Sequence, residues 1–360
     1  MEKKNSVPLR ERFKNFFKRE NSIEPLKLSE DKRIEEKRDV WILSIDGGGI
    51  RGIIPAFVLD SLQETLNEMS DTEAPIASYF DLISGTSTGG LITLCLAKNE
   101  PLPTKEIKAL YLNKNKIFFP PQNGFFERLI KTKYSDVQMM QFLDEMFKDD
   151  KIEDLKTNVL IMSYDIQNGE PFALSNGATP GFPLKIAARA TIAAPTYYSP
   201  LKTIYNGTKR TLIDGGVIAN NPVLWAVMKA KLLYPNYNNI HVVSLGNFAK
   251  KATFDETSTS FSWIDITRGT LPIYSLYHSA SMQNANYIAL LSPDIDYIRL
   301  DINKENEPAI KMDDTSLSSI NRLTLLSNEL IQNSDDVIKD TAEKLIRHKK
   351  LFKEGTELIH

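Results

Sequence analysis

Residues 40–52 read VWILSIDGGGIRG, and residues 80–90 read FDLISGTSTGG. Each stretch begins with an apolar run of strand length and breaks into a glycine-rich turn. A helical pattern of apolar residues follows, over 53–69 after the first turn and to about Ala97 after the second. Strand, glycine-rich turn and helix in repeated succession are typical of a parallel sheet wrapped by helices. The two stretches therefore predict an α/β fold.

The rest of the chain continues this pattern. Strands are expected at 40–45, 80–84, 158–166, 171–175, 211–213, 240–245 and 296–300. Helices are expected at 104–117, 136–148, 184–193, 222–232 and 273–291, besides a charged and mostly helical tail over 315–350. We therefore divide the chain into a charged N-terminal extension (1–39), an α/β catalytic domain (40–300) and a helical C-terminal cap (301–360).

The N-terminal extension contains one distinctive segment. Residues 9–19 (LRERFKNFFKR) carry five Lys or Arg residues against a single Glu. Phe13, Phe16 and Phe17 fall on one face of a helix at this spacing. Two interpretations stay open: an amphipathic helix that lies on an anionic membrane, or a helix whose Phe residues pack on the body of the protein.

Composition narrows the class of protein. The chain has 360 residues, 42% of them hydrophobic and 25% charged, with a net charge of −2. This balance is that of a globular protein, and no overall charge favours nucleic acid. The polar N-terminus has no apolar stretch of signal-peptide type, and no segment is apolar enough to span a membrane. Cys95 is the single cysteine, and its apolar neighbours predict a buried core residue. We expect a cytoplasmic protein, with secretion as an effector left open.

Residues 85–89 (GTSTG) match the pattern G-x-S-x-G, with Ser87 at its centre. The pattern alone also fits an ordinary strand-to-helix loop. Here it follows an apolar strand and opens an apolar helix, which is the setting of a nucleophile elbow. Such a turn holds the serine hydroxyl at the carboxyl edge of the sheet above a helix N-terminus, where developing negative charge is favoured. Ser87 is therefore the candidate nucleophile.

The earlier glycine loop allows two interpretations. Gly47, Gly49 and Gly52 fit G-x-G-x-x-G, which suggests dinucleotide binding. That site expects an acidic residue at the end of the second strand, which here ends in the Ser87 turn instead. The alternative is a row of backbone N–H groups beside a helix start, which forms an anion cradle. If the two strands are neighbours, this cradle faces Ser87 as an oxyanion hole, and Arg51 could hold a phosphate or another anionic head group.

A serine hydroxyl needs a base. None of the four histidines follows a strand: His241 begins the strand IHVVSL, His278 lies within a helical pattern, and His348 and His360 belong to the tail. Asp214 directly follows the short apolar strand 211–213 and precedes two glycines. A carboxylate there can reach the edge that carries Ser87, and partial burial would raise its pKa toward that of a useful base. A simple Asp-Gly turn is the alternative interpretation.

Together these motifs resemble the patatin-like phospholipases. The matching blocks are 45–52 (IDGGGIRG), 85–90 (GTSTGG), 188–200 (ARATIAAPTYYSP) and 214–222 (DGGVIANNP), and they span roughly residues 40–250. The resemblance implies a three-layer sandwich with a mostly parallel central sheet flanked by helices. It also implies a Ser–Asp dyad of Ser87 and Asp214, with an oxyanion hole formed by Gly47, Gly48, Gly49, Arg51 and Gly52. The resemblance does not extend to the first 39 residues or to the tail beyond about residue 300.

The function implied is a lipid acyl hydrolase of phospholipase A type. It would release fatty acids from glycerophospholipids without calcium, another metal or a cofactor. A regulated or non-catalytic lipid- or nucleotide-binding module on the same scaffold is the alternative. The expected partners are a phospholipid substrate and a peripheral membrane surface, with no nucleic acid. An activating partner, small molecule or oligomer is left open.

Overall fold

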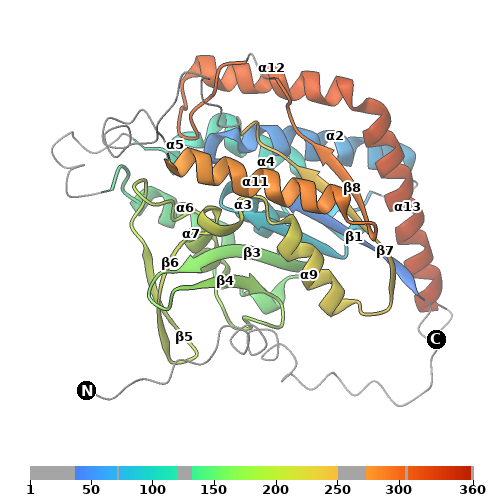
Figure 1. Ribbon diagram of the computed structural model, residues 1–360, viewed down its shortest axis with the longest axis horizontal. Coiled ribbons are helices and arrows are strands. Elements are labelled where there is room, and N and C mark those ends of the chain that lie inside the picture. The colour runs from blue at the N-terminus through green and yellow to red at the C-terminus, as the bar shows by residue number, and fades with distance from the viewer. Residues whose placement is uncertain (1–36, 71–72, 121–131, 250–272, 305–306, 358–360) are drawn as a thin grey trace, which may run out of the picture.

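The computed structural model describes residues 37–70, 73–120, 132–249, 273–304 and 307–357 (Figure 1). The segment 9–19, predicted as a helix, lies outside these residues. The strands are β1 (Arg38–Ile45), β2 (Leu82–Thr86), β3 (Asn158–Asp165), β4 (Glu170–Ser175), β5 (Leu201–Tyr205), β6 (Thr208–Asp214), β7 (Tyr237–Leu245) and β8 (Ile295–Leu300). The helices are α2 (Ile53–Met69), α3 (Thr88–Ala97), α4 (Thr104–Asn113), α5 (Asn115–Phe118), α6 (Val137–Phe147), α7 (Leu184–Thr191), α8 (Gly216–Ala219), α9 (Val223–Leu233), α11 (Ile273–Leu291), α12 (Leu317–Asn333) and α13 (Asp335–Glu357). Short 3₁₀ turns are η2 (Gly49–Gly52), η3 (Ile76–Tyr79) and η5 (Ile152–Asp154).

The described strands form one eight-stranded sheet in the order β5-β6-β3-β2-β1-β7-β8, with β4 paired to β3. Strands β3, β2, β1, β7 and β8 run parallel, whereas β4, β5 and β6 are antiparallel to their neighbours. The expected mostly parallel sheet is confirmed. Strand β5 was not predicted from the sequence. It is a five-residue strand at the end of the sheet with no buried position, and it lacks the apolar run of a core strand.

Helices cover both faces of the sheet, which gives the expected three layers. In β1, Trp41, Leu43 and Ile45 point into the larger hydrophobic cluster with α2, α3, α12 and α13. Val40 and Ile42 point to the other face, against α8, α9 and α11. Successive strand residues face opposite sides, so a strand covered on both faces must be apolar throughout. Figure 1 shows α9 and α11 together on the face nearest the viewer.

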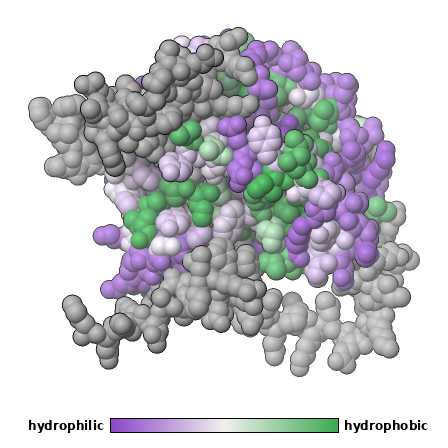
Figure 2. Space-filling model, in the orientation of Figure 1, coloured by the Kyte–Doolittle hydropathy of each residue, from purple (hydrophilic) through white to green (hydrophobic). Residues whose placement is uncertain are grey.

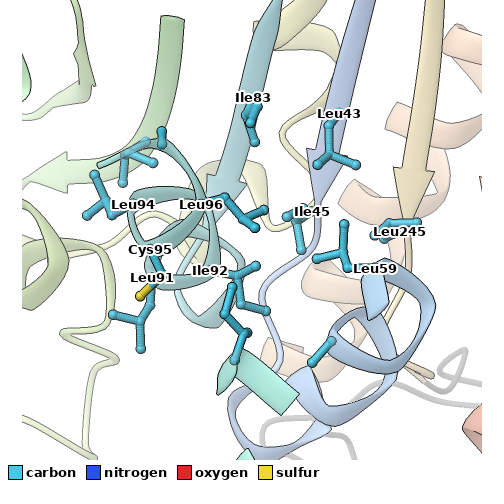
Figure 3. Packing of buried hydrophobic residues seen from close by; sticks show 14 of the residues in the cluster. Leu43, Ile45, Leu59, Ile83, Leu91, Ile92, Leu94, Cys95, Leu96 and Leu245 are labelled. Carbon is cyan, nitrogen blue, oxygen red and sulfur yellow. The ribbon is translucent and has the colours of Figure 1, made fainter. Parts of the chain in front are cut away.

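Helix α3 is buried along its whole length, at all ten of its residues. Figure 3 shows Ile92 and Leu96 of this helix turned toward Ile45 of β1. Cys95 lies in the same cluster and is only 1% exposed, which confirms its prediction as a core residue. Burial raises the pKa of its thiol to about 12, so Cys95 is an inert packing group.

The junction of β2, β3 and β6 determines where the site forms. Strand β4 runs along one side of β3, so β2 and β6 must share the other side. On that side β2 pairs as far as Met162, and β6 takes over at Ser163. Because β6 is antiparallel to β3 and β2 is parallel to it, the carboxyl ends of β2 and β6 meet head to head. Thr86 and Asp214, the last residues of these two strands, therefore come together.

The C-terminal helices share the core of the α/β body. Leu323 and Leu326 of α12 and Leu345 of α13 belong to the larger hydrophobic cluster, with α2. Each fully buried side chain of this size contributes roughly 1.5–3 kcal/mol to stability. The connection between β8 and α12 passes over the glycine loop, where the Met312 carbonyl accepts a hydrogen bond from the Ile50 amide (2.8 Å). The predicted cap region thus reaches the candidate site.

Candidate active site

Ser87 occupies a strained turn between β2 and α3. Its φ of 55° and ψ of −122° are rare for a residue other than glycine. The turn is tight enough that a Cβ on Gly85 would lie 2.2 Å from the carbonyl oxygen of Gly89. The Ser87 amide donates to the Thr191 hydroxyl (2.8 Å), which in turn donates to the Met162 carbonyl (2.7 Å). Thr191 thus ties the elbow to α7 and β3, and the expected strand–turn–helix setting is confirmed.

Asp214 lies beside Ser87 and is only 5% exposed. Its carboxyl group accepts a hydrogen bond from the Gly216 amide (2.7 Å), and it lines the same pocket as Ser87. Burial raises the pKa of this carboxyl group to about 6, and the nearby Ser87 hydroxyl and the Gly216 amide oppose the increase. A carboxylate with a pKa near 6 is a much better proton acceptor than an exposed one. The structure therefore brings together in one pocket two residues that were predicted from separate motifs.

The amides of the glycine loop are not all available to a substrate. The Gly47 amide donates to the Asn220 carbonyl (3.0 Å), and the Ile50 amide donates to Met312. The Arg51 amide bonds back to the Gly48 carbonyl (3.3 Å). Among the described residues, the amides of Gly48 and Gly49 have no acceptor. Both glycines line pockets that also contain Ser87, so their amides are the ones that remain open to a ligand there.

Side chains from distant parts of the chain hold this loop in place. The Gly47 carbonyl accepts hydrogen bonds from the side-chain amides of Asn220 (2.9 Å) and Asn247. Asp46, which is fully buried, accepts two hydrogen bonds from the Arg299 guanidinium (3.0 and 2.6 Å). Arg299 also bonds Asp301 (2.7 Å). Because a buried bidentate ion pair has a fixed geometry, Arg299 of β8 fixes the first residue of the loop.

A polar pocket contains Ser87 and Asp214 together with Arg51 and His278. The Arg51 Nε donates to the Gly48 carbonyl (3.2 Å), and within the described residues no carboxylate forms a salt bridge with Arg51. Burial lowers the pKa of this guanidinium, although it remains cationic at neutral pH. Burial, together with the charge of Arg51, lowers the pKa of His278 to about 4. The pocket therefore has one cation and a neutral imidazole among its described residues.

A second, apolar pocket also reaches Ser87. The space between its lining atoms is about 510 Å³, open solvent at its mouth included. Ser87, Ala194 and Met312 line both pockets. The apolar walls come from α3, α4, α5, α6 and the segments after α5 and α7. They are formed by Leu91, Tyr111, Phe118, Phe119, Met139, Ile192 and Tyr198.

The sequence placed most of these residues but missed several. Gly52, predicted as part of the oxyanion loop, is a packing position: a Cβ there would lie 2.6 Å from the Thr88 hydroxyl. His278 was set aside because it lies in a helix; the helix is confirmed as α11, but the inference that His278 lies away from the site is wrong, since α11 brings it to the pocket. Met312 and Arg299 gave no motif signal. Asn220 lies within the block DGGVIANNP and could have been singled out there.

The other described histidines lie away from Ser87. His241 pairs with Trp41 in the first half of β1, away from the carboxyl ends of the parallel strands, and its Nδ1 lies 2.8 Å from Asp296. The prediction that His241 lies away from the edge with Ser87 is confirmed, but His241 does not begin its strand, since β7 starts at Tyr237, four residues earlier. His348 of α13 contacts Asp81, the residue before β2 (3.0 Å). His360 lies outside the described residues. Within the described ranges, no group of three or more His, Cys, Asp and Glu side chains could hold a metal ion.

A parallel sheet whose central strand ends in a strained serine turn, next to a buried carboxyl group, defines an α/β protein of serine-hydrolase type. The family model of the patatin-like phospholipases matches residues 43–227. The chain belongs to this family of lipid acyl hydrolases.

Relatives align with most of the chain. Patatin-like protein 2 of Arabidopsis thaliana is 32% identical over 338 residues, which covers 81% of this chain and 83% of the relative. Patatin-17 of Solanum cardiophyllum is 31% identical, and the match covers 89% of this chain and 91% of that protein. A Solanum tuberosum relative, "Probable inactive patatin-3-Kuras 1", is 32% identical, and the match covers 82% of this chain and 87% of that protein. The solved structure of VipD from Legionella pneumophila aligns with 87% of this chain and 67% of its own at 12% identity. Its TM-score of 0.39 is too low for any inference.

Proposed function

We propose that this protein hydrolyses fatty-acid esters of glycerophospholipids, with Ser87 as nucleophile and Asp214 as its base. This would make it a carboxylic ester hydrolase of phospholipase A type. The observation that carries the proposal is the buried carboxyl group of Asp214, which lines one pocket with Ser87 and whose pKa is raised to about 6. Such a group is ionised at neutral pH and still basic enough to accept the serine proton in the transition state.

The reaction begins when the Ser87 oxygen attacks the ester carbonyl and its proton passes to Asp214. The amides of Gly48 and Gly49 and the N-terminus of α3 stabilise the oxyanion of the tetrahedral intermediate. The intermediate collapses, and protonated Asp214 gives its proton to the departing alkoxide of the lysolipid. Water then attacks the acyl-serine while Asp214 accepts a proton from it. As the second tetrahedral intermediate collapses, Asp214 returns this proton to the Ser87 oxygen and the fatty acid leaves. The loss of one oxyanion donor typically costs a factor of about 10²–10³ in rate.

Two features of the pockets support a phospholipid as substrate. The apolar pocket begins at Ser87 and continues between aromatic and aliphatic side chains, which suits an acyl chain. Arg51 lines the polar pocket, which also reaches Ser87, and a guanidinium there can bind a phosphate through two parallel hydrogen bonds. The scissile ester would then lie between the chain and the phosphate, as it does in a glycerophospholipid.

The test is mass spectrometry of the products released from mixed phospholipids by the wild type, Ser87→Ala and Asp214→Ala. We expect free fatty acid and lysolipid from the wild type, and release reduced at least about 10³-fold in either variant. Circular dichroism would establish that the variants remain folded. Full activity in either variant contradicts the dyad. No product from the wild type favours a non-catalytic lipid-binding module, in line with the name of the potato relative.

A further inference from the structure

Helix α11 has an unusual composition for a surface helix. It spans 19 residues, Ile273–Leu291, and contains no Asp, Glu, Lys or Arg. By contrast, α12 and α13 on the other side of the sheet carry charges that form ion pairs. A helix at the surface of a globular protein normally presents charged residues to water. The solvent-facing side of α11 therefore suggests an environment other than water.

The exposed side of α11 is formed largely by big apolar and aromatic side chains. Met282, Ala285 and Ala289 are buried toward the protein. The outer side carries Leu276, Tyr277, Tyr287, Ile288, Leu290 and Leu291, of which Tyr277 is 72% and Leu291 is 77% exposed. Isolated exposed apolar residues are common, but six on one helix without a charge between them form a patch.

Neighbouring elements extend this patch. Met228 and Leu232 of α9, one helical turn apart, are 52% and 46% exposed, and Val217 of α8 is 41% exposed. Both α8 and α9 pack against α11. Figure 2 shows hydrophobic residues gathered on this side of the molecule, over the region where Figure 1 places α11 and α9. We call the exposed apolar residues of α8, α9 and α11 the apolar face.

The apolar face is continuous with the mouth of the candidate active site. Val217 is exposed on this face and also lines the polar pocket that contains Ser87 and Asp214. His278 lines the same pocket and directly follows Tyr277 in α11. A surface that covers the apolar face would therefore lie against the pocket opening.

We propose that the apolar face docks on a lipid bilayer, with α11 lying flat in the interface and the pocket opening toward the lipids. This inference rests on the proposed function, which requires the site to receive a lipid. Tyrosines with an apolar ring and a polar tip favour the boundary between head groups and acyl chains. Within the described residues no helix is long and apolar enough to cross a membrane, so α11 would lie on the bilayer. Because α11 has no Lys or Arg, docking should not require anionic lipid.

The test is co-sedimentation of the full chain with vesicles of phosphatidylcholine alone, which have no net charge and so do not attract the basic residues of segment 9–19. We expect the wild type to bind, with little change between about 0.05 and about 0.5 M NaCl. The double variant Tyr287→Glu, Leu291→Glu should bind at least about tenfold more weakly. The matched control is Leu317→Glu on α12, whose side chain is 79% exposed and lies outside the apolar face. It should bind as the wild type does.

A second readout separates this inference from the proposed function. Hydrolysis of a water-soluble ester such as p-nitrophenyl butyrate needs no bilayer, so the double variant should keep wild-type turnover of it while losing turnover of vesicle lipid. Absence of soluble-ester hydrolysis in the wild type would count against the proposed function, whatever the vesicle result. Three results would overturn docking: no binding by the wild type, equal binding by the double variant, or a wild-type dimer that the double variant converts to a monomer. The last would mark the apolar face as a contact between two copies.

Discussion

The substitution Asp214→Asn should stabilise this protein while it abolishes ester hydrolysis. Asparagine has nearly the shape of aspartate, and its side-chain oxygen can accept the same hydrogen bond from the Gly216 amide. It cannot take a proton from the serine, so the reaction stops. It also removes a carboxylate that must be ionised in a place where water cannot solvate it.

The magnitude follows from the pKa of Asp214. Burial raises it from the ordinary value of 3.8 to about 6 in the folded protein. The folded state therefore favours the protonated carboxyl group, and the stability it confers is complete below pH 3.8 and is lost as pH rises through 6. Above pH 6 the ionised group costs the wild type about 3 kcal/mol, since each pKa unit corresponds to about 1.4 kcal/mol. The asparagine variant would not carry that cost.

The assay is urea unfolding of the wild type and Asp214→Asn at intervals from about pH 4 to about pH 8. The variant should match the wild type near pH 4, gain on it up to pH 6, and remain more stable by about 3 kcal/mol above that. Asp46, whose pKa burial also raises to about 6, is present in both proteins and cancels in the difference. A gain that does not change with pH, or a variant less stable than the wild type at pH 8, would refute the reasoning.

Two further predictions concern the same site. For a soluble ester, kcat/KM should rise about tenfold per pH unit up to a midpoint near 6 and then level, because Asp214 must be ionised to act as a base; a flat profile from about pH 5 to about pH 8 would contradict this. Gly49→Ala should lower kcat/KM at least about tenfold, because the new Cβ would lie 2.0 Å from the Met312 carbonyl oxygen and displace the oxyanion loop. Gly169→Ala is the matched control: both glycines have a positive φ, 62° and 66°, and the same conformational cost of about 1–2 kcal/mol, but the space around Gly169 is open. Equal activity of the two variants would show that the contact with Met312 has no effect on the loop.

The core of the fold was predictable because it depends on local sequence signals. Apolar runs followed by glycine turns identified β1 and β2, and the elbow required glycines where the backbone approaches itself most closely, as at Gly85. The helix predicted over 53–69 and the one predicted over 273–291 have the same bounds in the structure. Strand β5 was missed, since a partly exposed strand at the sheet's end needs no continuous apolar run.

The residues of the candidate site were also predicted from the sequence, because they lie in ordered motifs. These motifs pointed separately to Ser87, to Asp214 and to the glycine loop. Their meeting could not be derived from the sequence, because the orientation of β6 was unknown. The sequence suggested only that a carboxylate at the end of a strand can reach the edge that carries Ser87, whereas the structure brings Asp214 there on an antiparallel strand whose end meets that of β2.

Tertiary structure alone decided which loop amides are available and which distant side chains complete the site. The Gly47 amide donates its hydrogen bond to the Asn220 carbonyl. Met312, in the connection between β8 and α12, accepts a hydrogen bond from the loop. His278 reached the pocket through a helix whose sequence carries no catalytic motif. The physical reason is that motifs record local backbone requirements, whereas hydrogen-bond partners and pocket walls depend on how separate elements pack. The sequence thus determined the groups that can react, and packing determined the surroundings in which they would do so.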